Sequence, residues 1–168
     1  MNAWHLKTLA ALAFVAGLAT QHGIAAPRQV EAFDKDSWAS LQSGLKQPAV
    51  VVFSTTDCAH CPSVVDGLAR DIRQRQLKAQ LLTVVMDAAP GEDDAALLKH
   101  PHYARAHRLF AFSGQAPALR YSVEPKWRGV TPYVVFLAPG QAPRAVTGPP
   151  SKEDVQNWAR LSSAVAQR

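Results

Sequence analysis

A run of apolar residues followed at once by two cysteines, and then by a helical pattern, constrains the fold more than any other feature. The run AVVVFS, residues 49–54, is typical of a strand buried on both faces. Cys58 and Cys61 follow as C-x-x-C, and apolar residues then recur at helical spacing over 62–78. Residues 81–87 predict a second buried strand. A strand, helix and strand unit of this length is a parallel crossover, so the sequence predicts an α/β domain.

Flanking patterns predict the elements before and after this unit. Residues 34–47 predict a helix that ends at Pro48. In the middle of the chain, residues 91–100 predict two or three helical turns and residues 108–112 a short strand. A further helical segment follows, with Ser113 as its expected N-cap.

The end of the chain predicts a hairpin and a last helix. Residues 132–138 and 143–148 flank the turn sequence PGQA, which is typical of two antiparallel strands. Ser151 and Asp154 then have the spacing of a capping pair at the start of the final helix.

The first 25 residues predict a cleavable signal peptide. Lys7 lies in a short basic region, an uncharged stretch covers 8–20, and Gly23 and Ala25 are the small residues expected before a cleavage site. A retained membrane anchor is the alternative, although the uncharged stretch is shorter than the roughly 20 residues that a spanning helix needs. Export, most simply to a bacterial periplasm, follows from this pattern, and such compartments are oxidising.

Residues 26–32 are expected to form a polar linker and residues 33–168 a single domain. The formal net charge of +5 is small, and basic and acidic side chains alternate along the chain. Because no basic stripe is interleaved with aromatic residues, we exclude nucleic acid as a partner.

The two cysteines are the only ones in the chain, and three uses of such a pair are compatible with the sequence. A structural disulfide across two residues closes a very small loop and constrains the unfolded chain little. A structural zinc needs two more ligands, and the sequence has no second C-x-x-C or C-x-x-H. A redox dithiol fits best, because the N-terminus of a helix favours a thiolate.

In the dithiol interpretation, Cys58 is the exposed nucleophile, and Cys61, one turn inside the helix, resolves the mixed disulfide. His60, when protonated, places a positive charge beside the Cys58 thiolate and makes the pair more oxidising. Asp57 acts in the opposite sense.

The order of elements resembles that of the thioredoxin superfamily. The stretches that carry the resemblance are VVVFSTTDCAHCP (50–62) and GVTPYVVFLAPG (129–140), and the resemblance covers about residues 33–166. Within the superfamily the chain is most similar to the exported TlpA and redoxin branch, and more distantly to Sco-type copper-assembly proteins. The resemblance implies a thioredoxin fold, in which helices flank a central mixed sheet of four or five strands and an insert precedes the Thr-Pro loop.

The resemblance also implies a site and an activity. Thr131 and Pro132 would form a loop with a cis peptide bond that faces the dithiol and binds the backbone of an extended substrate. The activity would be thiol-disulfide exchange with protein cysteines, with no cofactor besides the redox-active disulfide and with a membrane protein as redox partner. C-x-H-C looks like the family's exported oxidases and isomerases, whereas the TlpA-like branch is mostly reducing, so the direction is left open.

Two positions depart from the family pattern. Asp57 stands where relatives commonly have a Trp, and Val52 stands where many have a buried acid. Proton handling at this site is therefore expected to differ from that of the relatives.

Two other functions remain open at this stage. A Sco-like copper-binding assembly factor would use Cys58, Cys61 and one insert histidine. The candidate histidines are His100, His102 and His107. Thiolates with imidazole suit copper, but the Sco spacing is C-x-x-x-C. The other alternative is a non-catalytic binding module with a redoxin fold.

Overall fold

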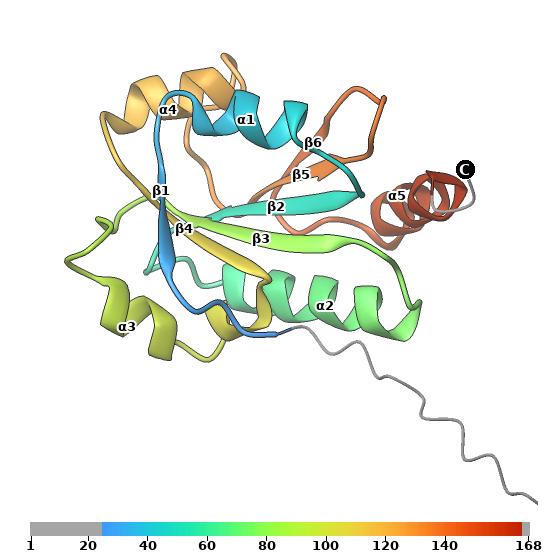
Figure 1. Cartoon of the computed structure of the whole chain (residues 1–168), viewed down its shortest axis with the longest axis horizontal. Helices are drawn as coiled ribbons and strands as arrows, with labels where there is room; N and C mark the ends of the chain where they lie inside the picture. Colours follow the sequence, from blue (N-terminus) through green and yellow to red (C-terminus); the bar gives the residue numbers. More distant parts are fainter. Residues whose placement is uncertain (1–24, 166–168) are drawn as a thin grey trace, which may run out of the picture.

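The computed structural model describes residues 25–165 and is organised around strand β2 (Ala49–Ser54), which is buried along its whole length (Figure 1). The sheet has six strands in the order β1-β4-β3-β2-β5-β6. The other strands are β1 (Val30–Phe33), β3 (Gln80–Val85), β4 (Arg108–Phe112), β5 (Tyr133–Leu137) and β6 (Arg144–Thr147). β2 pairs in parallel with β3 and antiparallel with β5, so the sheet is mixed as predicted.

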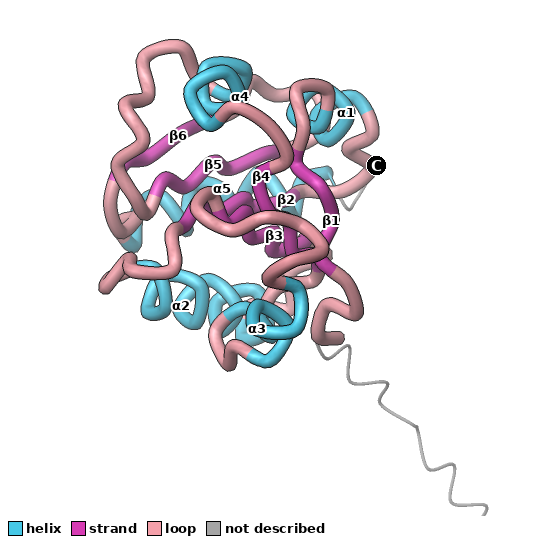
Figure 2. The backbone as a smooth tube through the Cα atoms, turned by 90° about the vertical axis from the view of Figure 1, so that its left-hand side faces the viewer, coloured by secondary structure: helices cyan, strands magenta, loops and turns pink. Residues whose placement is uncertain are grey.

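Helices cover both faces of this sheet. They are α1 (Ser37–Ser43), α2 (Cys61–Gln74), α3 (Asp94–Lys99), the short 3-10 helix η1 (Tyr103–Arg105), α4 (Ala116–Val123) and α5 (Lys152–Val165). Figures 1 and 2 show α1 and α4 on one side, and α2 and α3 on the other. α3, η1, β4 and α4 form the insert predicted before the Thr-Pro loop.

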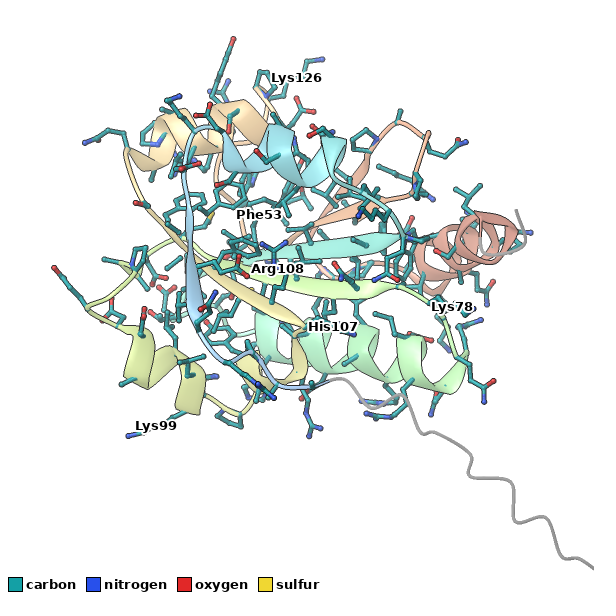
Figure 3. All side chains as sticks on the ribbon, in the orientation of Figure 1. Phe53, Lys78, Lys99, His107, Arg108 and Lys126 are labelled. Atoms are coloured by element: carbon teal, nitrogen blue, oxygen red, sulfur yellow. A yellow bond between two sulfur atoms is a disulfide. The ribbon has the colours of Figure 1, made fainter. Side chains whose placement is uncertain are left out.

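Alternating side chains of β2 build the two halves of the core. Val51 and Phe53 pack in the cluster beneath α1 and α4, where Figure 3 labels Phe53. Val50 and Val52 point to the opposite face and pack against α2 and α5. This period-two alternation explains why an unbroken apolar run forms a central strand rather than one with a solvent face.

Strand β1 corrects the prediction of a linker over 26–32. Val30, Glu31 and Ala32 belong to this edge strand, which pairs in parallel with β4 and makes the sheet six-stranded rather than four- or five-stranded. Glu31 accepts two hydrogen bonds from the Arg108 guanidinium, at 2.7 and 2.5 Å. Because these contacts come from a strand far along the chain, four residues of local sequence do not reveal them.

Helix ends also differ from the predictions. The predicted helix over 34–47 is helical only over Ser37–Ser43. Gln115, rather than Ser113, occupies the N-cap of α4. The capping pair of α5 is confirmed: Ser151 Oγ accepts from the Asp154 N–H at 3.1 Å, and Asp154 Oδ2 accepts from the Ser151 N–H at 2.8 Å.

The predicted signal peptide lies outside the described residues, apart from residue 25. None of the helices within 25–165 is both long enough and apolar enough to cross a membrane.

Candidate active site

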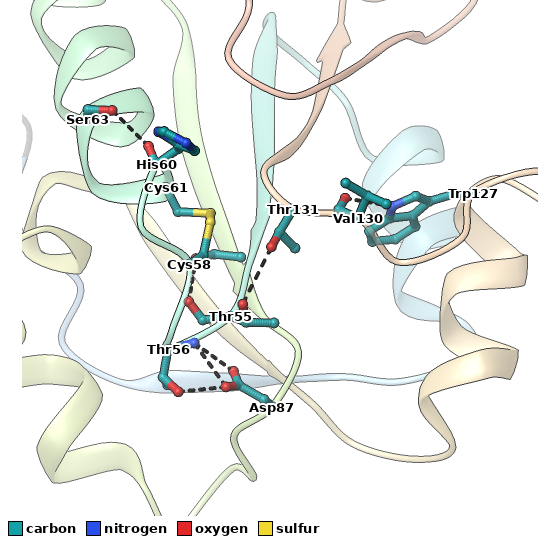
Figure 4. The surroundings of a disulfide bond; sticks show 11 residues. Thr55, Thr56, Cys58, His60, Cys61, Ser63, Asp87, Trp127, Val130 and Thr131 are labelled. Carbon is teal, nitrogen blue, oxygen red and sulfur yellow. Dashed lines mark hydrogen bonds between the residues drawn. A yellow bond between two sulfur atoms is a disulfide. The ribbon is translucent and has the colours of Figure 1, made fainter.

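The two cysteines lie where β2 ends and α2 begins, and they form a disulfide with a Cα–Cα distance of 5.5 Å (Figure 4). Cys61 is the first residue of α2 and is 2 % exposed, whereas Cys58 is half-buried in the turn before the helix. Cys61 therefore starts the helix and does not lie one turn inside it. Of the two cysteines, Cys58 is the more exposed.

Two consecutive turns carry the chain from β2 to α2. The Cys58 N–H donates to the Thr55 carbonyl at 3.2 Å, which closes the turn Thr55–Cys58. The Cys61 N–H donates to the Cys58 carbonyl at 3.3 Å, which closes the second turn. His60 then occupies the N-cap of α2, and the Ser63 hydroxyl donates to its carbonyl at 2.8 Å.

The Thr-Pro loop lies beside the first of these turns. The peptide bond between Thr131 and Pro132 is cis, as predicted. β5 starts directly after this loop and pairs Tyr133 with Phe53 near the end of β2. The hydroxyl oxygens of Thr55 and Thr131 lie 3.5 Å apart, and Figure 4 shows Thr131 beside the turn that leads to Cys58.

Trp127 anchors the backbone at Val130, just before the cis bond, to the core. Its indole Nε1–H donates to the Val130 carbonyl at 3.1 Å. Its ring stacks on Tyr133, with centroids 4.3 Å apart, and contacts Phe53 edge-on. Val130 itself is 55 % exposed. An apolar side chain thus faces solvent next to the loop, on a backbone that a buried ring holds in place.

Asp87 is a site residue that the sequence reasoning missed. Its carboxylate accepts the Thr56 N–H at 2.9 and 3.0 Å and the Thr56 hydroxyl at 2.6 Å (Figure 4). Thr56 lies two residues before Cys58. The available signal was an acid at the end of the predicted strand 81–87, at the carboxyl end of the strand beside β2.

The positions that depart from the family pattern have contrasting surroundings. Val52 is fully buried among apolar side chains of the α2 face. Asp57 and His60 are both exposed on the turns that carry the cysteines. The site therefore has titratable side chains at its surface, and an apolar one where many relatives have the buried acid.

The histidines of the insert are spread over separate environments. His107 Nδ1 accepts from the Leu81 N–H at 2.9 Å. Leu81 lies near the amino end of β3, whereas the cysteines follow the carboxyl end of the parallel strand β2. Burial lowers the pKa of His107. His102 Nδ1 lies 3.3 Å from Asp66 on α2. His100 packs its ring 4.6 Å from that of Tyr103.

A copper site made of the two cysteines and one of these histidines is therefore not assembled. Within residues 25–165, no group of three or more His, Cys, Asp and Glu side chains lies close enough together to hold a metal ion.

Comparisons with known proteins identify solved structures that have a similar fold. No family model and no curated protein matches the sequence. Among solved structures, a thioredoxin-related protein from Neisseria meningitidis serogroup B is similar, with 16 % identity over 73 % of this chain and 90 % of that chain and a TM-score of 0.53. A thiol:disulfide interchange protein of the thioredoxin family from Chlorobium tepidum matches with 16 % identity over 74 % of this chain and 83 % of that chain, at a TM-score of 0.51.

The described chain has the thioredoxin fold, as the resemblance in sequence predicted. Its C-x-x-C pair lies at the junction of β2 and α2, next to a cis-proline loop.

Proposed function

We propose that the protein is an exported thiol-disulfide oxidoreductase that exchanges disulfides with cysteines of other proteins. The observation that carries the proposal is the Cys58–Cys61 disulfide, which lies between the start of α2 and the cis Thr131–Pro132 loop. The backbone N–H groups at a helix start and the helix dipole stabilise a nearby thiolate. A partly exposed thiol in that position is the group that attacks a disulfide.

The exchange takes two steps in the reducing direction. The Cys58 thiolate attacks one sulfur of the substrate disulfide, forms a mixed disulfide and releases the first substrate thiolate. The Cys61 thiolate then attacks the Cys58 sulfur and releases the second substrate thiolate, so that the substrate gains two electrons and the pair returns to the disulfide. The reverse sequence oxidises a substrate dithiol. The potential of the pair relative to that of its partner decides which direction dominates.

The neighbouring residues have supporting roles in this scheme. His60, exposed at the N-cap of α2, adds a positive charge near the Cys58 thiolate when protonated. The backbone of Thr131, with the ring of Pro132 behind it, binds an extended segment of the substrate. Exposed Val130 adds an apolar contact for that segment.

Export and the redox partner follow from the sequence patterns. We assign the protein to the exported TlpA and redoxin branch, because an insert precedes its Thr-Pro loop and residues 1–25 have the features of a signal peptide. In an oxidising compartment a dithiol consumed by its substrates needs a second dithiol or disulfide protein to restore it. We propose that this partner is a membrane redox protein.

The function is tested by exchange with a peptide that carries a fluorescently quenched disulfide. Wild-type protein is expected to accelerate its cleavage by a small dithiol, and Cys58→Ser to abolish the acceleration. Cys61→Ser is expected to accumulate the mixed disulfide through Cys58. A wild-type protein that gives no acceleration in either direction, although its disulfide is reducible, would instead favour a non-catalytic binding module.

A further inference from the structure

The carboxylate of Asp87 holds the turn that presents Cys58. Both of its oxygens accept from Thr56: they share the single backbone N–H at 2.9 and 3.0 Å, and one of them also accepts the hydroxyl at 2.6 Å. Thr56 is a central residue of the turn closed by the bond from the Cys58 N–H to the Thr55 carbonyl. A carboxylate that fixes a central residue of a four-residue turn also fixes the residue at its end. Thr56 thus connects Asp87 to the turn that ends at Cys58.

The sheet explains why Asp87 lies opposite Thr56. β3 runs parallel to β2 and pairs Val85 with Ser54, and the Met86 N–H donates to the Ser54 carbonyl at 2.9 Å. One further residue along the chain brings Asp87 level with Thr56. The backbone hydrogen bonds between β2 and β3 end at this point. The Asp87 side chain then makes the next contact between the two segments.

Thr56 and Asp87 are both exposed, and Tyr103 of the insert lies near Asp87. Tyr103 of η1 is buried, and the negative charge of Asp87 contributes to raising its pKa. Burial raises the pKa of Tyr103, so this neighbour stays neutral. The titratable groups on the loop of Cys58 itself are Asp57 and His60.

We propose that Asp87 is a positioning residue for Cys58: it fixes the Thr55–Cys58 turn and, by its negative charge, disfavours the Cys58 thiolate. This proposal rests on the proposed function, because it assigns the residue a role in the same exchange. Hydrogen bonds to a charged acceptor are among the stronger ones in proteins, and a nearby like charge raises a thiol pKa. Asp87 touches neither cysteine sulfur nor substrate in this scheme, and acts through Thr56.

The test measures the alkylation rate of Cys58 against pH and the rate of disulfide exchange in Asp87→Asn, Asp87→Ala and Asp87→Glu. Asp87→Asn is expected to move the pH midpoint of alkylation to lower pH, because the charge is lost. Asp87→Ala is expected to slow exchange about tenfold, because the N–H and the hydroxyl of Thr56 both lose their acceptor. Asp87→Glu is expected to restore the wild-type midpoint but only part of the exchange rate.

Asp94→Asn is the matched control. Asp94 is the first residue of α3, and its carboxylate also accepts a backbone N–H, that of Gly91 at 2.8 Å. It makes the same change of charge without touching the turn of Cys58. If Asp87→Asn and Asp87→Ala behave like Asp94→Asn in both measurements, the proposal is wrong.

Two further arms keep the test decisive. Should Asp87→Ala fail to fold, Thr56→Val removes the hydroxyl bond alone and is expected to slow exchange by a smaller factor, whereas Thr56→Ser is expected to match the wild type. A Thr56→Val rate equal to that of the wild type would then count against the role of the contact. The alkylation profile of reduced protein needs no enzymatic turnover, so failure of the proposed function and failure of this proposal remain distinguishable.

Discussion

The hydroxyl oxygens of Thr55 and Thr131 lie 3.5 Å apart, although 76 residues separate the two threonines in the chain. Thr55 opens the turn that ends at Cys58, and Thr131 precedes the cis bond to Pro132. The contact thus joins the segment of the proposed nucleophile to the segment proposed to bind substrate. Their relative position is set by two side chains as well as by the pairing of β2 with β5.

Thr131→Val removes one of these hydroxyls and keeps the shape of the side chain. We expect the apparent KM for a disulfide peptide to rise several-fold, while the free energy of unfolding falls by less than about 1 kcal/mol, the usual net value of a hydrogen bond. Thr147→Val, at an exposed position on the edge strand β6, is the matched control. Equal KM values for the two variants would show that the contact does not order the loop.

The reduced protein is expected to react with iodoacetamide at Cys58 before Cys61. Cys61 is 2 % exposed and Cys58 is half-buried, and alkylation requires access as well as a thiolate. Mass spectrometry of a time course gives the rate at each site, and we expect a difference of about tenfold or more. Equal rates would contradict the assignment of Cys58 as the nucleophile.

Trp127→Phe is expected to reduce exchange more than its effect on stability explains. It removes the bond from Nε1 to the Val130 carbonyl, which costs about 1 kcal/mol and frees the loop before Pro132. Trp158→Phe removes an equivalent bond, to the Leu137 carbonyl at 3.0 Å, away from the site. Chemical unfolding and peptide exchange are measured on both variants. An equal loss of exchange in Trp158→Phe would show that the hydrogen bond of Trp127 has no specific effect on exchange.

His107 is expected to make folding stability depend on pH. Burial lowers the pKa of His107 in the folded protein below the ordinary value of 6.5, so the unfolded chain binds the proton more readily. Protonation of Nδ1 would also remove the acceptor of the Leu81 N–H. The stability from neutral His107 is complete above about pH 6.5 and is lost as the pH falls toward the folded-state pKa.

The measurement is the free energy of unfolding at several pH values for wild type and His107→Asn, whose amide oxygen can still accept the Leu81 N–H. The wild type should lose stability relative to the variant as the pH falls from 7 to 5. A constant difference across this range would contradict the account.

Much of the fold was predictable from local patterns. The apolar run 49–54, the helical spacing after Pro62 and the capping pair Ser151 and Asp154 each encode their own structure within a few residues. Strand β1 was not predictable, because its four residues become a strand only through β4 and the Glu31–Arg108 pair. The Ser113 cap was also wrong, since α4 begins two residues later than that cap would require.

The candidate site was predictable where the residues adjoin a motif. The cysteines were marked by C-x-x-C, whereas the cis bond at Pro132 was predictable only through the resemblance to the thioredoxin superfamily. The two segments meet because β2 pairs with β5. Asp87 was missed because its partner, Thr56, lies 31 positions away in the chain, and no local pattern marks which N–H or hydroxyl a carboxylate will meet. The partners of the insert histidines were unpredictable for the same reason. In the structure His107 contacts the Leu81 N–H, whereas His102 contacts Asp66.

The most direct test of a redox role is a titration of the Cys58–Cys61 pair in glutathione or dithiol buffers of known potential, with alkylation to count free thiols. We predict a single reversible two-electron transition between about −270 and −120 mV, the range of thioredoxin-fold oxidoreductases, which disappears in Cys58→Ser. A disulfide that stays closed until the potential falls below about −300 mV would be a structural one and would contradict the proposed function.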